Sequence, residues 1–285
     1  MMGKDRIGVI VDSFRVGLRE GIKKAKEVGA TGIQLYAVSG EMDPGNLKPA
    51  ARQELLDFIK SNDLVVSALC GDLGGHGFAR REENAWKIEK SKRILELARD
   101  LETQIVTTHI GVVPGDRNSE KWKIMQEACR ELGELAERMG GSFAVETGPE
   151  KTALLKEFLG SLGTRGIGVN YDPANLVMVT GEDPVAGVYN LRDYIVHTHA
   201  KDGVMKKQED PEVIYNFFAE GGIGDIRLSD YFIETPLGQG QVDFPRYVKA
   251  LEDIGYKGFF TIEREVGEDP EKDIREAVRF LQGIL

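Results

Sequence analysis

The chain has 285 residues, a formal net charge of −10 and two cysteines. This length suits one large domain, and the acidic balance argues against nucleic acid as the main partner, because nucleic-acid-binding proteins neutralise phosphates with clustered Lys and Arg. Cys70 and Cys129 form neither a disulfide framework nor a CxxC metal site. No apolar run approaches the roughly 18 residues of a membrane span, and the run that ends at Asp12 is too short for a signal peptide, so we expect a cytoplasmic protein.

Short runs rich in valine and isoleucine alternate along the chain with longer amphipathic segments. The short runs predict strands at Arg6–Val11, Gly32–Tyr36, Leu64–Leu69, Gln104–His109, Ser142–Glu146, Ile167–Tyr171, Tyr194–His199 and Gly258–Glu263. The amphipathic segments predict helices at Leu18–Val28, Ala50–Ser61, Ala85–Leu101, Glu120–Met139, Lys151–Leu159, Asp183–Leu191, Pro245–Ile254 and Pro270–Leu281. Alternating strands and helices indicate parallel βαβ units, so we predict an α/β fold: a single (β/α)₈ TIM barrel over residues 1–285.

A doubly wound open sheet is the alternative architecture. Such a sheet normally has a glycine-rich phosphate-binding turn after its first strand. Here the first predicted strand continues into VDSFR at 11–15, without a GxGxxG motif. The absence of that motif favours the closed barrel.

One connection, about residues 203–235, is unusually long. It follows the seventh predicted strand, and from Asp202 to Gln241 the sequence carries charges, aromatic residues and glycines without a strong helical pattern. Long insertions of this kind tend to cover the active site. We expect this segment to cover the mouth of the site in its own subunit, or in a neighbouring subunit of a homo-oligomer. A disordered loop without a function is the alternative.

Charged or imidazole side chains end four consecutive predicted strands, the fifth to the eighth. These residues are Glu146, Asp172, His199 and Glu263. Active sites of such barrels lie where the strands end. Intervals of 26, 27 and 64 residues separate them in turn, which corresponds to one strand–helix unit, one further unit, and one unit plus the long insertion. Because neighbouring units lie side by side, we expect the four side chains to converge.

Three carboxylates and one imidazole at one point would repel one another without a cation. A divalent ion removes that repulsion. Oxygen-rich ligation with a single histidine suits Mn²⁺, Mg²⁺ or Co²⁺, and Zn²⁺ is also compatible. A salt bridge at the rim explains any one of these residues alone, but four in register favour a site for one divalent metal.

Four further residues near predicted strand ends are candidates for substrate binding: His109, His76, Lys201 and Phe14. His109 ends the fourth strand, and Lys201 continues the inward face of His199, where it could meet a carboxylate or a phosphate. His76 lies in a glycine-rich loop after the third strand, and Phe14 could form the floor of the pocket. An ordinary packing or rim role is the alternative for each of them.

Several stretches resemble the sugar phosphate isomerase/epimerase family of xylose isomerase-like TIM barrels. They are AVETG at 144–148, GVNYDPAN at 168–175, HTHAKD at 197–202 and PLGQGQVDFPRYVKALEDIGYKGFFTIERE at 236–265. The resemblance implies that the four strand-end residues bind one divalent metal, most commonly Mn²⁺. It also implies that Glu146 and Glu263 act as acid and base on a small carbohydrate, through an enediolate that the metal stabilises.

Two positions depart from the epimerases of this family. Asn175 stands where they carry a histidine that contacts the substrate, and Met205 stands where they carry a substrate-binding arginine. These departures argue against ketose 3-epimerase activity. We predict an isomerase or epimerase of a small sugar or keto-sugar, with Asn175 as a further substrate-binding candidate. Hydroxypyruvate isomerases and dehydratases share the metal frame. A metal-dependent dehydratase or lyase acting on a keto-inositol, a keto-sugar acid or a 3-keto-glycoside is therefore the alternative.

Two other functional classes fit the sequence less well. Apurinic-site endonucleases share this barrel, but they use three zinc ions and many histidines, whereas this chain has four histidines in total and Asn175 at a position where a ligand would be needed. A non-catalytic sugar-binding barrel would have lost a metal ligand or a glutamate, and both glutamates are present. We expect an enzyme with a small carbohydrate substrate, and no nucleic acid or membrane as a partner.

Overall fold

A closed barrel of parallel strands forms the centre of the molecule. The computed structural model describes residues 5–222 and 226–285, and within them eight strands close in the order β1-β10-β7-β6-β5-β4-β3-β2. The strands are β1 (Ile7–Ile10), β2 (Gly32–Tyr36), β3 (Val65–Cys70), β4 (Ile105–Thr108), β5 (Ser142–Glu146), β6 (Ile167–Tyr171), β7 (Ile195–Ala200) and β10 (Phe260–Ile262). The predicted TIM barrel is confirmed.

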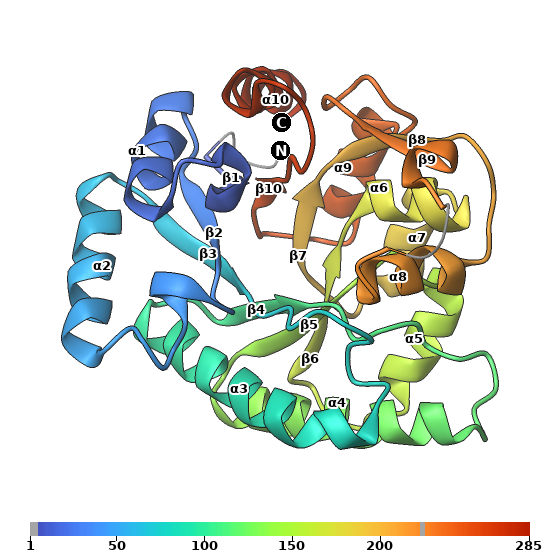
Figure 1. Cartoon of the computed structure of the whole chain (residues 1–285). Coiled ribbons are helices and arrows are strands. Elements are labelled where there is room, and N and C mark those ends of the chain that lie inside the picture. Colours follow the sequence, from blue (N-terminus) through green and yellow to red (C-terminus); the bar gives the residue numbers. More distant parts are fainter. Residues whose placement is uncertain (1–4, 223–225) are drawn as a thin grey trace.

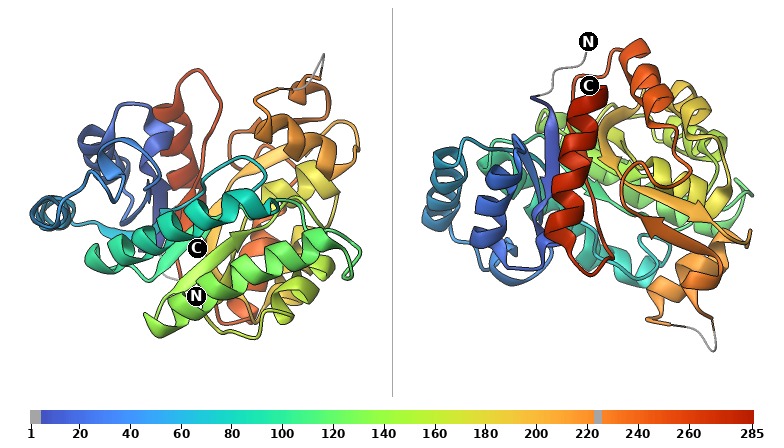
Figure 2. Two further views of the ribbon diagram at one scale, coloured as in Figure 1. Left: turned by 60° about the horizontal axis from the view of Figure 1, so that its bottom comes forward. Right: turned by 90° about the horizontal axis from the view of Figure 1, so that it is seen from above.

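Helices form a ring around the strands (Figure 1). They are α1 (Leu18–Val28), α2 (Pro49–Ser61), α3 (Arg81–Asp100), α4 (Glu120–Arg138), α5 (Thr152–Gly160), α7 (Pro184–Leu191), α9 (Phe244–Asp253) and α10 (Pro270–Ile284). A helix of three residues, α6 (Pro173–Asn175), directly follows β6 at the end of the barrel that carries Asp172. The last helix, α10, contacts α1, α9 and β1, and so closes the ring beside the first strand (Figure 2). Over the described residues, no helix has both the length and the apolar character needed to cross a membrane.

Helix α4 illustrates how the sequence specifies these elements. Its buried side chains recur every third or fourth residue, which places them on one face towards the barrel: Trp122, Met125, Cys129, Leu132 and Ala136. The hydroxyl of Ser119 caps the helix by accepting a hydrogen bond from the Trp122 N–H at 3.2 Å. Trp122 also packs edge-on against Phe158 of α5, with ring centroids 5.0 Å apart. These contacts fix neighbouring units, and therefore the strand ends, relative to one another.

The segment after β7 differs most from its prediction. It folds into β8 (Asp202–Met205), α8 (Pro211–Ala219) and β9 (Phe232–Thr235), and β8 and β9 pair as a small antiparallel sheet. The sequence shows no strong helical pattern here, because the apolar residues of α8 follow one another instead of recurring with a helical period, yet this part of the segment is helical. Residues 223–225 of the predicted loop lie outside the described residues. In both views of Figure 2, α8 (orange) stands out from the ring of helices.

Asp202 attaches the end of this segment to the barrel. Its carboxylate, which is 1% exposed, accepts hydrogen bonds from the backbone N–H groups of Gly203 (2.8 Å), Gly238 (3.0 Å), Gly240 (2.8 Å) and Val242 (3.1 Å). A Cβ on Gly240 would lie 2.2 Å from the Asp202 Oδ1 atom, so only glycine allows this close approach. One buried carboxylate thus holds the chain on both sides of the insertion.

Replacing Asp202 with asparagine should destabilise the protein by about 2–3 kcal/mol, because the new amide NH₂ would face backbone N–H groups and leave buried donors unsatisfied. Urea denaturation monitored by circular dichroism measures this change. Asp230→Asn, an exposed carboxylate in the same segment, is the matched control and should leave the free energy of unfolding within about 0.5 kcal/mol of wild type. Equal effects of the two substitutions would contradict the anchoring role.

Candidate metal centre

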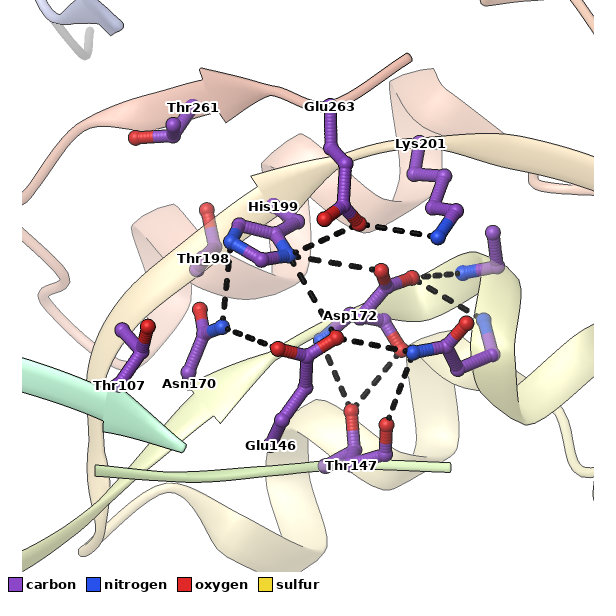
Figure 3. A network of polar contacts seen from close by, with 12 residues as sticks. Thr107, Glu146, Thr147, Asn170, Asp172, Thr198, His199, Lys201, Thr261 and Glu263 are labelled. Atoms are coloured by element: carbon purple, nitrogen blue, oxygen red, sulfur yellow. Dashed lines mark hydrogen bonds and ion pairs between the residues drawn. The ribbon is translucent and has the colours of Figure 1, made fainter. Parts of the chain in front are cut away.

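The four strand-end residues converge at the carboxyl-terminal ends of β5, β6, β7 and β10, which are neighbours in the barrel. One ligand atom from each of Glu146, Asp172, His199 and Glu263 lies within 4.8 Å of the others, and all four residues are buried. The His199 Nδ1 atom lies 3.7 Å from Glu146 Oε1, 3.5 Å from Asp172 Oδ2 and 3.3 Å from Glu263 Oε2. Figure 3 shows the two glutamate carboxylates pointing at the imidazole from opposite sides.

Two of these atoms lack a hydrogen-bond partner among the described residues: Asp172 Oδ2 and His199 Nδ1. The other carboxylate oxygen of Asp172 accepts hydrogen bonds from the N–H groups of Ala174 (2.8 Å) and Asn175 (3.0 Å) at the start of α6, so Oδ2 is left to face the imidazole. An unpaired buried polar atom costs free energy. A cation between the two atoms would remove that cost, and a set of three carboxylates and one imidazole suits a divalent ion. The residues therefore fit a metal.

The hydrogen bonds behind His199 determine which ring nitrogen is free. Thr107 of β4 donates to the Leu69 carbonyl at 3.5 Å, so its oxygen accepts from the Gln34 Nε2 group at 3.1 Å. That orientation turns the Gln34 Oε1 atom of β2 towards His199 Nε2, at 3.1 Å. His199 Nε2 is thus occupied by contacts behind the ring, and Nδ1 is the ring nitrogen that faces the three carboxylates, which leaves it as the nitrogen for a metal.

A buried chain of side chains orients Glu146. Thr261 donates to His197 Nε2 at 3.0 Å, His197 Nδ1 donates to Asn170 Oδ1 at 2.8 Å, and Asn170 Nδ2 donates to Glu146 Oε2 at 3.0 Å. Burial lowers the pKa of His197 well below its ordinary value, and a neutral ring suits one donated and one accepted bond. Asn175 Nδ2 donates to the other oxygen of Glu146 at 3.0 Å. Both oxygens of this glutamate are therefore fixed.

Lys201 orients Glu263 in the same way. Its Nζ atom donates to Glu263 Oε2 at 2.9 Å and also to Glu265. Burial would raise the pKa of Glu263, but Lys201 and His199 hold that pKa well below its ordinary value. For His199 burial acts in the opposite direction, and the carboxylates of Glu263 and Glu146 nevertheless raise its pKa well above 6.5. A metal that binds Nδ1 must therefore displace a proton.

A cavity of about 220 Å³ opens in front of these residues. Three of the predicted substrate-binding residues line it: His109, Asn175 and Lys201. The Nδ1 atom of His109 donates to Asp72 Oδ2 at 3.0 Å, and its Nε2 atom lies 3.7 Å from Glu146 Oε1. His109 is thus held by one carboxylate and faces another across the cavity.

Two predicted residues lie elsewhere. His76 lines an adjoining cavity, where its Nε2 atom lies 2.6 Å from Glu220 Oε1. Phe14 is 3% exposed and packs in the hydrophobic core. The short turn Val11–Phe14 directs the ring of Phe14 into the core. Phe14 is therefore not among the described residues that line the cavity.

The lining residues that were not identified from the sequence include Tyr36, Asp72, Tyr215 and Phe218. Tyr36 ends β2 and Asp72 follows β3, so the strand-end rule that found Glu146 could have found both. Tyr215 and Phe218 belong to α8, and no pattern in the sequence of this helix indicates that it lines the cavity. The ring of Tyr215 lies 6.0 Å from that of His109, centroid to centroid.

A sequence profile described as "Xylose isomerase-like TIM barrel" matches residues 22–284. The chain belongs to the xylose isomerase-like TIM barrel family. This xylose isomerase-like barrel is 26% identical over 157 residues to the inosose dehydratase of Lacticaseibacillus casei, which covers 54% of this chain and 49% of that protein. It spans about half the length of the curated relatives it matches first.

Solved structures also resemble this xylose isomerase-like barrel. The xylose isomerase domain protein from Planctomyces limnophilus superposes with a TM-score of 0.80 at 23% identity, covering 98% of this chain and 96% of that one. The 3-keto-D-glucoside 4-epimerase YcjR from E. coli superposes with a TM-score of 0.71 at 17% identity, covering 98% and 99% of the two chains. At these identities the two structures support the fold alone.

Metal binding should release about one proton per ion at pH 7.5, because the raised pKa of His199 leaves a proton on the metal-free site that the ion displaces. Calorimetric titration of the metal-free protein with Mn²⁺ in two buffers of different ionisation enthalpy measures the number of protons released. The same heat in both buffers would contradict this assignment. An Asp172→Asn variant, which removes one ligand charge, should bind the ion more weakly.

Glu150, in the loop after β5, provides a test of stability against pH. Its Oε2 atom accepts from the Val113 N–H at 3.2 Å, and its buried Oε1 atom has no partner among the described residues. Burial raises its pKa from 4.5 to about 8. The folded protein therefore keeps a proton that the unfolded chain loses, so the stability is complete below pH 4.5 and falls as pH rises towards 8.

In a Glu150→Gln variant this loss should disappear. The free energy of unfolding of the variant, relative to wild type, should increase between pH 5 and pH 8 by up to about 1.4 kcal/mol per pH unit. Urea denaturation across that range measures the difference, with the exposed Glu134→Gln as the control. A difference that does not change with pH would show that Glu150 is ionised in the folded protein.

Proposed function

We propose that this protein is a divalent-metal-dependent isomerase or epimerase of a small sugar or keto-sugar, with Glu146 and Glu263 as its acid and base. One observation carries the proposal: the two carboxylates approach a single buried point, at 3.7 and 3.3 Å from the Nδ1 atom of His199. They come from β5 and β10, which have β7 and β6 between them. A substrate bound at that point has one glutamate near each face.

Bound by these four residues, a divalent ion such as Mn²⁺, with Mg²⁺, Co²⁺ or Zn²⁺ as alternatives, would act as a Lewis acid on the substrate carbonyl and stabilise the negative charge that develops. One glutamate removes the proton from the carbon next to that carbonyl through a carboxylate oxygen. The other glutamate returns a proton to the opposite face of the same carbon, which inverts its configuration. Return of the proton to the former carbonyl carbon instead, with transfer of the hydroxyl proton from the neighbouring oxygen to the former carbonyl oxygen, gives the isomer.

The remaining residues of the cavity bind and position. Asn175 and Asn170 fix Glu146, and Lys201 fixes Glu263, so neither carboxylate has to reorganise during the proton transfer. His109 offers its Nε2 atom to a substrate hydroxyl. Tyr215 covers the cavity from α8 and restricts the access of water.

A dehydratase is the second candidate, and two observations favour it. The inosose dehydratase of L. casei is 26% identical over 157 residues. In addition, burial would lower the pKa of His109, but the carboxylates of Glu146 and Asp72 raise it to about 10, so its ring carries a proton. While a glutamate removes the proton next to the carbonyl, His109 could protonate the hydroxyl on the adjacent carbon. That hydroxyl then leaves as water and a carbon–carbon double bond forms.

The experiment that separates the two reactions is incubation of the Mn²⁺-loaded protein with ketoses, keto-inositols and 3-keto-glycosides in D₂O. Proton NMR that shows deuterium beside the carbonyl in an epimer or isomer supports the first function. An unsaturated product with loss of water supports the second function. If none of these compounds exchanges a proton in the presence of bound metal, both functions are contradicted.

Glu146→Gln and Glu263→Gln should each lower the rate of proton exchange by about 10²–10⁴-fold, the usual contribution of a positioned acid–base group. The fold should persist, because both side chains lie at the strand ends and not in the packed core. Metal content is measured in each variant, and Glu268→Gln, an exposed carboxylate beyond β10, is the control. A variant that keeps both its metal and nearly all of its exchange would show that this glutamate is only a ligand.

A further inference from the structure

A second cavity of about 240 Å³ adjoins the metal cavity. It lies between the loop after β3, the loop and first turn that follow β4, and α8. Its walls share Gly75, His109, Tyr215 and Ala219 with the metal cavity. A molecule larger than one cavity can therefore contact both.

The two cavities differ in the kind of charged side chain that lines them. The metal cavity is lined by the carboxylates of Asp72, Glu146, Glu263 and Glu265. The second cavity is lined by His76, Arg80, His109 and Lys121, and none of the described residues that line it is an aspartate or glutamate. Arg80 and Lys121 are cationic, and each has an exposed glutamate as its partner: Glu220 at 3.2 Å from Arg80 and Glu212 at 2.7 Å from Lys121. The cavity is therefore lined by donors that already bind carboxylates and could bind the carboxylate or phosphate of a ligand instead.

One carboxylate of the protein already binds there. Glu220, which follows α8, has its Oε1 atom 2.6 Å from His76 Nε2 and 3.2 Å from Arg80 Nη2. The side chain of Glu220 is 50% exposed, and exposed ion pairs contribute only about 0–1 kcal/mol. Arg80 and His76 thus already bind one carboxylate together, and the carboxylate of Glu220 is weakly held and can be displaced.

The backbone beneath these donors is closely packed. A Cβ on Gly77 would lie 2.1 Å from the Ile110 carbonyl carbon, and a Cβ on Gly111 would lie 2.4 Å from the His76 carbonyl oxygen. The Phe78 N–H also donates to the Ile110 carbonyl at 2.9 Å. The loops after β3 and β4 therefore form one layer, which fixes the position of His76 relative to His109 at the boundary of the metal cavity.

We propose that the second cavity binds an anionic group, a carboxylate or a phosphate, on the part of the substrate that does not react. The anion takes the place of Glu220 on His76 and Arg80. The substrate is then a sugar acid or a sugar phosphate, because a carboxylate or phosphate replaces the charge-assisted hydrogen bonds that Glu220 accepts, which a neutral hydroxyl does less well. Only this statement about the substrate rests on the proposed function; binding of an anion does not.

Calorimetric titration of the full-length protein with inorganic phosphate and with acetate tests the proposal. The protein is loaded with Mg²⁺, since manganese phosphate is poorly soluble. Arg80→Gln should weaken binding of the preferred anion at least about tenfold, the effect of losing one charge-assisted hydrogen bond. Arg81→Gln is the matched control, because Arg81 pairs with Glu127 outside the cavity and its loss changes the net charge equally. Preference for phosphate identifies a sugar phosphate, and preference for acetate identifies a sugar acid.

A second variant keeps the test independent of any folding defect in Arg80→Gln. Glu220→Gln removes the competing carboxylate and should tighten anion binding severalfold. Failure of both anions to bind the wild type, equal affinity in Arg80→Gln and Arg81→Gln, or no tightening in Glu220→Gln would overturn the proposal. Because anion binding requires no turnover, its failure is distinguishable from failure of the proposed reaction, which the exchange experiment in D₂O measures separately.

Discussion

The repulsion among three buried carboxylates at the ends of neighbouring strands is the constraint around which this structure is organised. Barrel closure brings Glu146, Asp172 and Glu263 within 4.8 Å of one another, together with His199. Burial of several negative charges at one point is unfavourable unless a positive charge accompanies them. The orphaned Asp172 Oδ2 and His199 Nδ1 atoms show where that charge belongs. A divalent cation supplies it more completely than the single proton of an imidazolium.

The polar side chains behind the centre serve that constraint. Gln34 orients the ring of His199, and Asn170 and His197 fix Glu146 through a chain that ends at Thr261. Each of these side chains occupies an inward position on a different strand, so the upper part of the barrel interior is polar where an ordinary core would be apolar. Such a network is favourable only when nearly every member is satisfied. The two atoms without a partner among the described residues, Asp172 Oδ2 and His199 Nδ1, lie where a metal ion would bind.

The sequence predicted the barrel because strand and helix periods alternate clearly. It predicted the centre because strand-end residues one unit apart must lie side by side. The ends of β2, β5, β6 and α1 agree with the structure residue for residue. Reasoning from the sequence failed where the position of a side chain depends on tertiary contacts. Helix α8 buries only Ile214 fully, so its sequence carries a weak helical pattern. The ring of Phe14 turns into the core, although this residue follows a strand. The strand-end rule could have found Asp72, but its hydrogen bond to His109 becomes visible only in the structure.

The long insertion links the two cavities. Tyr215 and Ala219 line both of them, so α8 forms part of their common wall. Ion pairs hold the two ends of this helix: Lys121 to Glu212 at 2.7 Å, and His76 to Glu220 at 2.6 Å. Both carboxylates are about half exposed, at 52% and 50%, so each pair contributes little. An anion that displaces Glu220 would therefore cost α8 little, because the Lys121–Glu212 pair at the other end remains and Tyr215 and Ala219 keep their places in the walls of both cavities.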